Sequence, residues 1–355
     1  MMLFSHTYSA RIRDTNLPIK GGYIALDAST YPHVTCSLTT SIRALDLLDP
    51  RGRRRVLLTA QAETPSTTQV RNFDLALRSR TVDHRNDTAT ITLASDEALL
   101  SDYRPLTDDA SPASMVLLRA IVTYVIHKVI PGAVIAPGSD AVLVLPDADP
   151  ESLVWRAGVT AMEFLRPLLQ AQGMRLLCDE TRTWYLRNAN LTGFGNLLKI
   201  ETARTLIDGG DTIDLDTDQW FDAAVTRYEW IDADGTRQER VDAYGPSGYT
   251  RCAFFEKATP YPGAGFSEYA VQRAQGRGRS VTATTISDWT VVAEAPVLVT
   301  LPRTAPQLGA IDTVRFSLDN DEMTVTARTT SAEGTAWAAG SPGESWSGSD
   351  DPWEG

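Results

Sequence analysis

Short runs in which apolar and polar residues alternate dominate the first 100 residues of the chain. The runs of strand length are YSARIRD, GGYIALDA, HVTCSLTT, RRVLLTAQAE, FDLALRSRTVD and TATITLAS. Turn and loop signals separate them, among them Gly21–Gly22, Asp49–Pro50 and the polar stretch HRND. Several short strands at this spacing predict an antiparallel β-barrel or sandwich over residues 1–100.

The pattern changes at Ser95, where helical signals begin. Ser95 followed by Asp96 and Glu97 predicts an N-cap with two acids that complement the helix dipole. A longer helix is expected to start at Ser111–Pro112, because Ser can cap it and Pro is tolerated in a first turn. The sequence Pro131–Gly132 is expected to end this helix.

A further helix is predicted from Thr160, where Thr160 and Glu163 form a T-x-x-E capping box. It is expected to end near Gly173, and Pro167 within it predicts a kink or a boundary because Pro removes a backbone hydrogen bond. The apolar runs MRLLC and TWYLR then flank the polar turn DETR and predict a β-hairpin. Residues 101–195 are therefore expected to form a small α+β domain.

Strand patterns return after Trp220. The runs AAVTRYEWI and TRQERVDAY flank a turn of the Asp-Gly type, and the segment from Phe266 to Gln275 predicts a short helix. The strands VTATTISDW, APVLVTL, DTVRFSL and EMTVTAR complete a second β-rich domain over residues 196–330. The expected fold class is α+β, mainly β, with a helix-plus-hairpin domain between two β-domains.

Residues 331–355 differ in composition from the rest of the chain. They are rich in Gly and Ser, contain five acids and no basic residue, and carry Trp337, Trp346 and Trp353 at near-regular intervals. This segment has too little apolar surface to fold alone. We interpret it as a candidate assembly arm that docks on a partner, and a mobile terminus is the alternative.

The composition limits the class of protein. At 355 residues and 43% hydrophobic, the chain is long enough for two or three domains, each with its own core. No run approaches the roughly 18 apolar residues of a membrane helix, and the first apolar run is too short for a signal peptide. Cys36, Cys178 and Cys252 are odd in number and widely spaced, so we expect buried free thiols and no disulfide.

The charge and the polar motifs supply no catalytic or cofactor site. The four histidines fall singly in separate segments, and neither HExxH nor Gly-x-Ser-x-Gly occurs. A calcium loop beginning at Asp214 would need Gly in place of Gln219 and Glu in place of Val225. We therefore interpret Asp214, Asp216 and Asp218 as acids that lie in an interdomain connection or face a channel.

The net charge of −12 argues against a surface that grips nucleic acid, since clustered Lys and Arg drive phosphate binding. An acidic or neutral wall would, however, allow DNA to slide through a channel without adhering. The sequence is therefore compatible with transient passage of DNA. It does not predict stable binding of nucleic acid, a cofactor or a metal.

Four segments of the sequence, taken in order, resemble a known protein family. They are RSRTVDHRNDTATITLASDEALLSDY, AMEFLRPLLQAQGMRLLCDETRTWYL, GRGRSVTATTISDW and FSLDNDEMTVTAR. Their order resembles the tail-tip (baseplate) hub proteins of long-tailed bacteriophages, called minor tail proteins in actinobacterial siphophages. The resemblance covers about residues 1–330. None of these segments is a catalytic signature, and relative to larger members of the family we expect the chain to lack a C-terminal hydrolase or receptor-binding extension.

The resemblance implies a structural virion protein of the tail tip, assembled in the host cytoplasm. It implies a homotrimer whose two tail-tube-like β-domains per subunit form a pseudo-sixfold ring, which joins the sixfold tail tube to the threefold tip. Such a hub closes or lines the DNA channel before ejection. Its implied partners are a distal tail protein, a tape measure protein and a tip fibre or other minor tail proteins. A distal tail ring protein and a tail-associated cell-wall hydrolase remain the alternatives.

Overall fold

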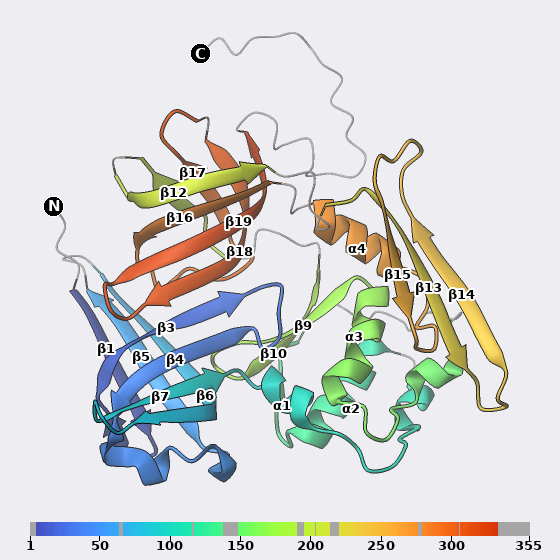
Figure 1. Ribbon diagram of the computed structural model, residues 1–355, viewed down its shortest axis with the longest axis horizontal. Helices are drawn as coiled ribbons and strands as arrows, with labels where there is room; N and C mark the ends of the chain where they lie inside the picture. The colour runs from blue at the N-terminus through green and yellow to red at the C-terminus, as the bar shows by residue number, and fades with distance from the viewer. Residues whose placement is uncertain are drawn as a thin grey trace.

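The computed structural model describes most of the chain. The described residues are 5–63, 67–115, 117–137, 148–189, 195–202, 204–213, 220–275, 279–304 and 306–332. Their strands form one sheet of thirteen strands and two sheets of three, and the fold is mainly β, as predicted. Figure 1 shows the large sheet on one side and the helices with the small sheets on the other.

The large sheet is antiparallel over most of its width, and the alternating pattern of its strands gives it one face that packs in the core. The hydrogen-bonded order is β12 (Leu206–Ile213), β16 (Arg279–Ile286), β19 (Glu322–Ala332), β18 (Gln307–Ser317), β3 (Ile19–Asp27), β4 (Val34–Ser41), β7 (Thr88–Ala94), β6 (Thr68–Asp83), β5 (Arg55–Glu63), β1 (Ser5–Ile12) and β2 (Thr15–Leu17). β17 (Pro296–Thr300) adds to β18, and β11 (Leu198–Glu201) pairs with β17 in parallel.

This sheet joins the two ends of the chain. β3 and β18 pair antiparallel, with Ile24 opposite Phe316. The core beneath them is also shared: Trp289 stacks on Phe316 with ring centroids 4.4 Å apart and meets the edge of Phe73 at 6.2 Å. The boundaries proposed at residues 100, 195 and 330 and the division into two barrels remain predictions, whereas the hydrogen bonding between the two β-rich halves is observed.

The middle of the chain forms a helical layer on a hairpin. Its elements are α1 (Glu97–Asp102), the 3₁₀ turn η3 (Ser111–Ser114), α2 (Leu118–Val129), β8 (Val134–Ile135), the 3₁₀ turn η4 (Pro150–Leu153), α3 (Ala161–Ala171), β9 (Met174–Cys178) and β10 (Thr183–Asn188). β9 and β10 form the predicted hairpin, and β8 pairs with β10 in parallel. Trp155 and Trp184 are fully buried in the core between the helices and this sheet.

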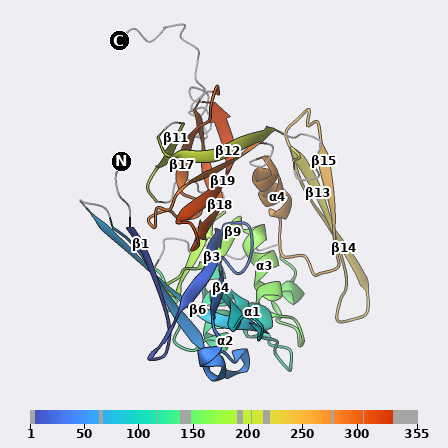
Figure 2. The same ribbon diagram turned by 60° about the vertical axis from the view of Figure 1, so that its left-hand side comes forward.

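A second small sheet contains β13 (Ala223–Ile231) between β14 (Arg237–Tyr244) and β15 (Cys252–Lys257). The predicted hairpin of β13 and β14 is confirmed, but these strands do not join the large sheet. The reason is the predicted helix α4 (Phe266–Gln275), which covers Thr226, Tyr228 and Trp230 on one face of the small sheet. Both views place α4 between this sheet and the large one (Figures 1 and 2).

Helix starts were predicted with mixed success. The capping box is confirmed: the Glu163 N–H donates to Thr160 Oγ1 at 3.1 Å, and the Thr160 N–H donates to Glu163 Oε2 at 2.9 Å. The predicted cap at Ser95 is wrong, because Asp96 is the N-cap residue and Ser95 Oγ instead accepts the Val34 N–H at 3.0 Å. The first helical residue is therefore Glu97.

The helix predicted from Ser111 is also wrong at its start. Ser111–Ser114 is a separate 3₁₀ turn, and Met115 after it is extended, with φ −98° and ψ 132°. The α-helix therefore begins only at Leu118 and ends at Val129, just before the predicted stop. Pro167 lies inside α3, which continues to Ala171, so the helix has no boundary at the proline.

Candidate functional site

The sequence-predicted site residues do not fall in the described structure. Trp337, Trp346 and Trp353 of the candidate arm lie outside the described residues, as do the candidate channel-facing or interdomain acids Asp214, Asp216 and Asp218. The next acid of that run, Asp222, accepts the backbone N–H groups of Thr250 and Arg251, each at 2.8 Å. Asp222 therefore fixes the loop that leads into β15.

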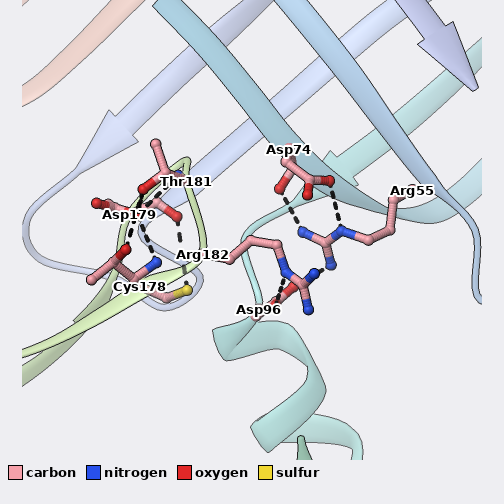
Figure 3. A network of polar contacts seen from close by, with 8 residues as sticks. Arg55, Asp74, Asp96, Cys178, Asp179, Thr181 and Arg182 are labelled. Carbon is pink, nitrogen blue, oxygen red and sulfur yellow. Dashed lines mark hydrogen bonds and ion pairs between the residues drawn. The ribbon is translucent and has the colours of Figure 1, made fainter. Parts of the chain in front are cut away.

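Polar side chains instead gather where the parts of the molecule meet. The first junction centres on Asp96, whose carboxylate is 1% exposed at the start of α1. Arg55 of β5 reaches Asp96 and also binds Asp74 of β6 at 2.7 Å, while Arg182 of the hairpin turn binds Asp96 at 3.0 Å (Figure 3). One buried carboxylate thus connects the large sheet, α1 and the hairpin, and the arginines satisfy the charge that burial would otherwise penalise.

The hairpin turn is held from within and from the sheet. Asp179 accepts the backbone N–H groups of Thr181 at 2.8 Å and of Thr183 at 2.9 Å, as Figure 3 partly shows. Beside it, Glu180 forms an ion pair with Arg71 of β6, with 2.6 Å between Arg71 Nε and Glu180 Oε1. Side-chain hydrogen bonds that close a turn restrict its conformations, so the hairpin presents a defined surface to the sheet.

A second junction is a buried cluster of charges. Glu294, 4% exposed, faces Arg175 of β9, Arg273 of α4 and Arg328 of β19, with the last two at 4.0 and 3.6 Å. Asp312 of β18 adds a second acid, 3.1 Å from Arg328 and 3.9 Å from Arg273. Burial, with Arg328 and Arg175 close by, lowers the pKa of Arg273 to about 10.

The residues of this cluster come from all three parts of the fold. β9 belongs to the helical layer, α4 to the small sheet, and β18 and β19 to the large sheet. Because a buried charge without its partner is strongly unfavourable, the five side chains favour one arrangement of the three parts over displaced ones. The role of these charges is therefore to hold the three parts of the fold in place relative to one another.

The face of the small sheet opposite α4 is exposed and partly apolar. On it, Phe254, Val241 and Ile231 are 54%, 55% and 70% exposed. Between them Arg227 lies 3.7 Å from Glu239 and within 5.2 Å of the Phe254 ring centre. β14 and β15 are edge strands of this sheet within the described residues. Exposed apolar side chains beside open strand edges are typical of an interaction surface.

Among the described residues, Glu97 is the one acid with a strongly raised pKa, and it lies in a structural setting. Burial raises the pKa of Glu97 to about 7, in the range of many general acids. However, Glu97 is 0% exposed, and its Oε1 accepts the Cys178 N–H of β9 at 2.7 Å. A catalytic acid must reach a substrate, so this geometry favours a role in joining α1 to the hairpin.

The described part of the chain contains no group of three or more His, Cys, Asp or Glu residues arranged for a metal ion. Its helices include none that is long and apolar enough to cross a membrane. Cys36 and Cys178 are buried free thiols as expected, whereas Cys252 is exposed, so the prediction that all three are buried is wrong. Cys252 begins β15 on the face of the small sheet that α4 does not cover.

Sequence reasoning missed the residues of both junctions. The one signal is a charge placed inside an otherwise apolar run, as with Arg175 in MRLLC, whereas Arg328 ends the partly polar run EMTVTAR and carries no such signal. Such residues are rarely buried unless they are paired. The pattern could have marked Arg175 as a buried ion-pair member, but it gives no information on which acid pairs with which arginine.

Comparison with known proteins identifies the fold. No family model matches the chain, and no curated protein matches its sequence. In three dimensions, however, the chain has the fold of bacteriophage tail proteins.

Three solved structures represent this likeness. The 43 kDa tail protein of prophage MuSo2 from Shewanella oneidensis has a TM-score of 0.61 at 14% identity, covering 90% of this chain and 97% of that one. A tail protein of Neisseria meningitidis MC58 has a TM-score of 0.57 at 12% identity, covering 91% and 96%. An E. coli type VI secretion component, itself similar to the T4 tail proteins gp27 and gp5, has a TM-score of 0.50 at 12% identity, covering 90% and 76%.

Proposed function

We propose that this chain is a structural component of a bacteriophage tail and acts as the hub of the tail tip. The observation that carries the proposal is the likeness to the Shewanella prophage tail protein, which extends over 90% of this chain. The likeness therefore concerns the arrangement of the three sheets and the helices together, not one widespread domain. A shared fold does not fix a function by itself, so the assembly must be tested directly.

In this proposal three copies surround the tail axis. Two β-rich parts per copy form a pseudo-sixfold ring that joins the sixfold tail tube to the threefold tip. The open edges of β14 and β15 and the exposed face of the small sheet support contacts between chains, because unpaired edges in an isolated subunit favour association. Distal tail, tape measure and other tip proteins are the proposed neighbours.

The same ring would close or line the channel through which DNA leaves the particle. The net charge of −12 is compatible with this role, because an acidic wall would repel phosphate and let DNA move without adhering. The DNA contact is accordingly transient. The candidate acids Asp214, Asp216 and Asp218 are proposed to face either this channel or an interdomain connection.

Cryo-electron microscopy of the tail tip tests the proposal. We expect three copies of the chain around the axis directly below the tube. Six copies would instead identify a distal tail or tube ring. Absence of the chain from the axis would contradict both readings, and peptidoglycan turnover abolished by one carboxylate substitution would then identify a cell-wall hydrolase.

The mass of the purified chain in solution gives an independent measure. Multi-angle light scattering should report three times the monomer mass of 38.8 kDa if the trimer forms without its neighbours. A hexamer would favour the ring protein. The exposed face can be tested at the same time, because Phe254→Asp should shift the assembly toward the monomer if this face joins the copies.

A further inference from the structure

A groove rich in arginine lies between the large sheet and the helical layer. It has a volume of about 760 Å³ and is bordered by the turn before β5, by β6, and by α1 and α2. Seven of its fourteen lining residues are arginines, and Asp102 is the one acid among them. This is unusual in a chain with a net charge of −12, so the groove differs in charge from the molecule as a whole.

Most of these arginines are neutralised by neighbours, but two are not. Arg51 binds Asp49 at 2.8 Å, and Arg78 binds Asp102 at 2.6 Å. The remaining pair, Arg53 and Arg54, has no acidic partner among the described residues, and Nη1 of Arg54 is buried without a hydrogen-bond acceptor. A buried donor without an acceptor is unfavourable, so an anionic group that reached Arg54 would be stabilised there.

The rest of the lining is apolar or aromatic. Leu77, Leu99, Tyr103 and Val129 lie in the same groove as the arginines. A ligand that fits both sets of groups carries carboxylates for the guanidinium groups and a ring or alkyl group for the apolar wall. Arginine also stacks on aromatic faces, which favours a ligand in which acids and aromatic residues alternate.

The chain itself contains such a ligand. The segment from Glu344 to Glu354, ESWSGSDDPWE, carries four acids and two tryptophans, and residues 331–355 contain no basic residue. The described chain ends at Ala332, and the 18 residues from there to Asp350 can span at most about 65 Å. We propose that the groove binds this C-terminal segment, with Asp350 and Asp351 on Arg53 and Arg54 and Trp353 against the apolar wall.

The apolar part of the lining favours this peptide over a nucleic-acid backbone. A phosphodiester chain would use the arginines but would leave Leu77, Leu99 and Val129 without contacts. The proposal does not depend on the tail-hub assignment, because it concerns two segments of one sequence. It assigns the acidic arm a binding site on this protein.

Photo-cross-linking in the full-length chain tests the proposal. Trp353 is replaced by p-benzoylphenylalanine, and the cross-linked peptides are identified by mass spectrometry. We expect cross-links to peptides that contain residues 50–55 and 99–104. The yield should fall about tenfold in the Arg53→Ala, Arg54→Gln double variant, because two charge-assisted hydrogen bonds are lost. It should also fall at about 1 M salt, where the screening length is only ~3 Å.

Matched variants separate the groove from general effects of charge. Arg240→Gln removes an exposed arginine of β14, far from the groove in sequence and in the fold, and should leave the yield unchanged. Asp350→Asn with Asp351→Asn changes only the arm, so it tests the same contact even if the double arginine variant fails to fold. Loss of cross-links in this arm variant is the expected result.

Two outcomes would overturn the proposal. One is cross-linking that maps outside the groove or that persists unchanged in both sets of variants. The other is a groove that takes phosphate: fluorescence anisotropy would show a labelled DNA duplex bound by the native chain, released by the double arginine variant and indifferent to the arm. In that case the arginines would serve nucleic acid, and the arm would have a different site.

Discussion

Single residues of this molecule show which sequence signals are reliable. Thr160 and Glu163 were predicted as a capping box and form one, because both members lie within one turn and their partners are each other's backbone. Ser95 carried a similar local signal, yet its hydroxyl bonds Val34, which is 61 residues away. A local pattern cannot show that a distant backbone N–H competes for the capping hydroxyl. Caps in which two nearby residues bond each other's backbone are therefore easier to predict.

The capping box leads to a stability prediction. Thr160→Ala should lower the free energy of unfolding by about 1 kcal/mol, because the Glu163 N–H loses its acceptor. Thr160→Ser keeps the capping oxygen and should change stability by less than about 0.5 kcal/mol. Urea denaturation followed by circular dichroism measures both, and equal midpoints for the native chain and the Ala variant would contradict the proposed role of the cap.

His33 leads to a prediction about pH. Its Nδ1 donates to the Asp27 carbonyl at 2.8 Å, and burial lowers the pKa of the ring to about 4. Below pH ~6.5 the unfolded chain takes up a proton that the folded chain resists, so this stability is present above pH ~6.5 and lost as the pH falls toward 4. At pH 5 the loss is up to about 2 kcal/mol, and less where solvent reaches the ring.

His33→Gln should therefore be less sensitive to acid than the native chain. The test compares denaturation midpoints at pH 7 and pH 5. Glu97, whose raised pKa makes stability fall as the pH rises, is common to both proteins, so its effect cancels in the comparison. His84→Gln, in an exposed turn, is the control and should follow the native profile.

At the scale of elements, segments with complete local signals were predicted well. The hairpin of β9 and β10, the hairpin of β13 and β14, and helix α4 all occur where the alternation and turn residues placed them. The helix expected from Ser111 failed because a Ser-Pro start is equally suited to a 3₁₀ turn. The Ser-Pro sequence predicts that a helical turn begins there, but it does not determine how many residues the helix includes.

The contact between two helices depends on a glycine. Gly265, just before α4, has φ +121°, and a Cβ there would lie 2.2 Å from the carbonyl oxygen of Ala171 at the end of α3. Gly265→Ala should therefore cost about 2–4 kcal/mol, the sum of backbone strain and overlap. Gly248→Ala should cost only about 1 kcal/mol, because Gly248 has φ +88° but no neighbour within 4 Å.

Thermal unfolding of the two glycine variants separates these causes. A larger loss for Gly265→Ala than for Gly248→Ala measures the steric part, since both positions have positive φ. Equal losses would mean that α4 shifts away from α3 without cost. The helix contact would then be looser than the structure indicates.

At the scale of the whole molecule, the sequence predicted the class but not the connections. The mainly β α+β class follows from periodicity, which is a local property. The pairing of β3 with β18 joins residues almost 300 positions apart, and nothing in either strand specifies the other. The charged junction around Glu294 was missed for the same reason, because its members come from four separate elements and from the turn before β17.

Glu294 is the residue on which that junction should depend most. Glu294→Gln leaves Arg175, Arg273 and Arg328 buried with Asp312 as their one acid in the cluster, and should cost about 3–5 kcal/mol of unfolding free energy. Glu268→Gln on the exposed side of α4 is the control and should cost less than about 0.5 kcal/mol. Chemical denaturation measures both, and a cost below about 1 kcal/mol for Glu294→Gln would show that the arginines have other counter-charges.

The pairing of β3 with β18 also determines when the protein can fold. During synthesis the first strands leave the ribosome long before their partner, so β3 keeps an open edge until residues 313–317 have been translated. Contacts between residues this distant in sequence form slowly. While the edge of β3 is unpaired, it can pair with a strand of another nascent chain. The large sheet can therefore be completed only after β18 has been translated, which makes the yield of folded protein dependent on the speed of synthesis and on chaperones that cover β3 until then.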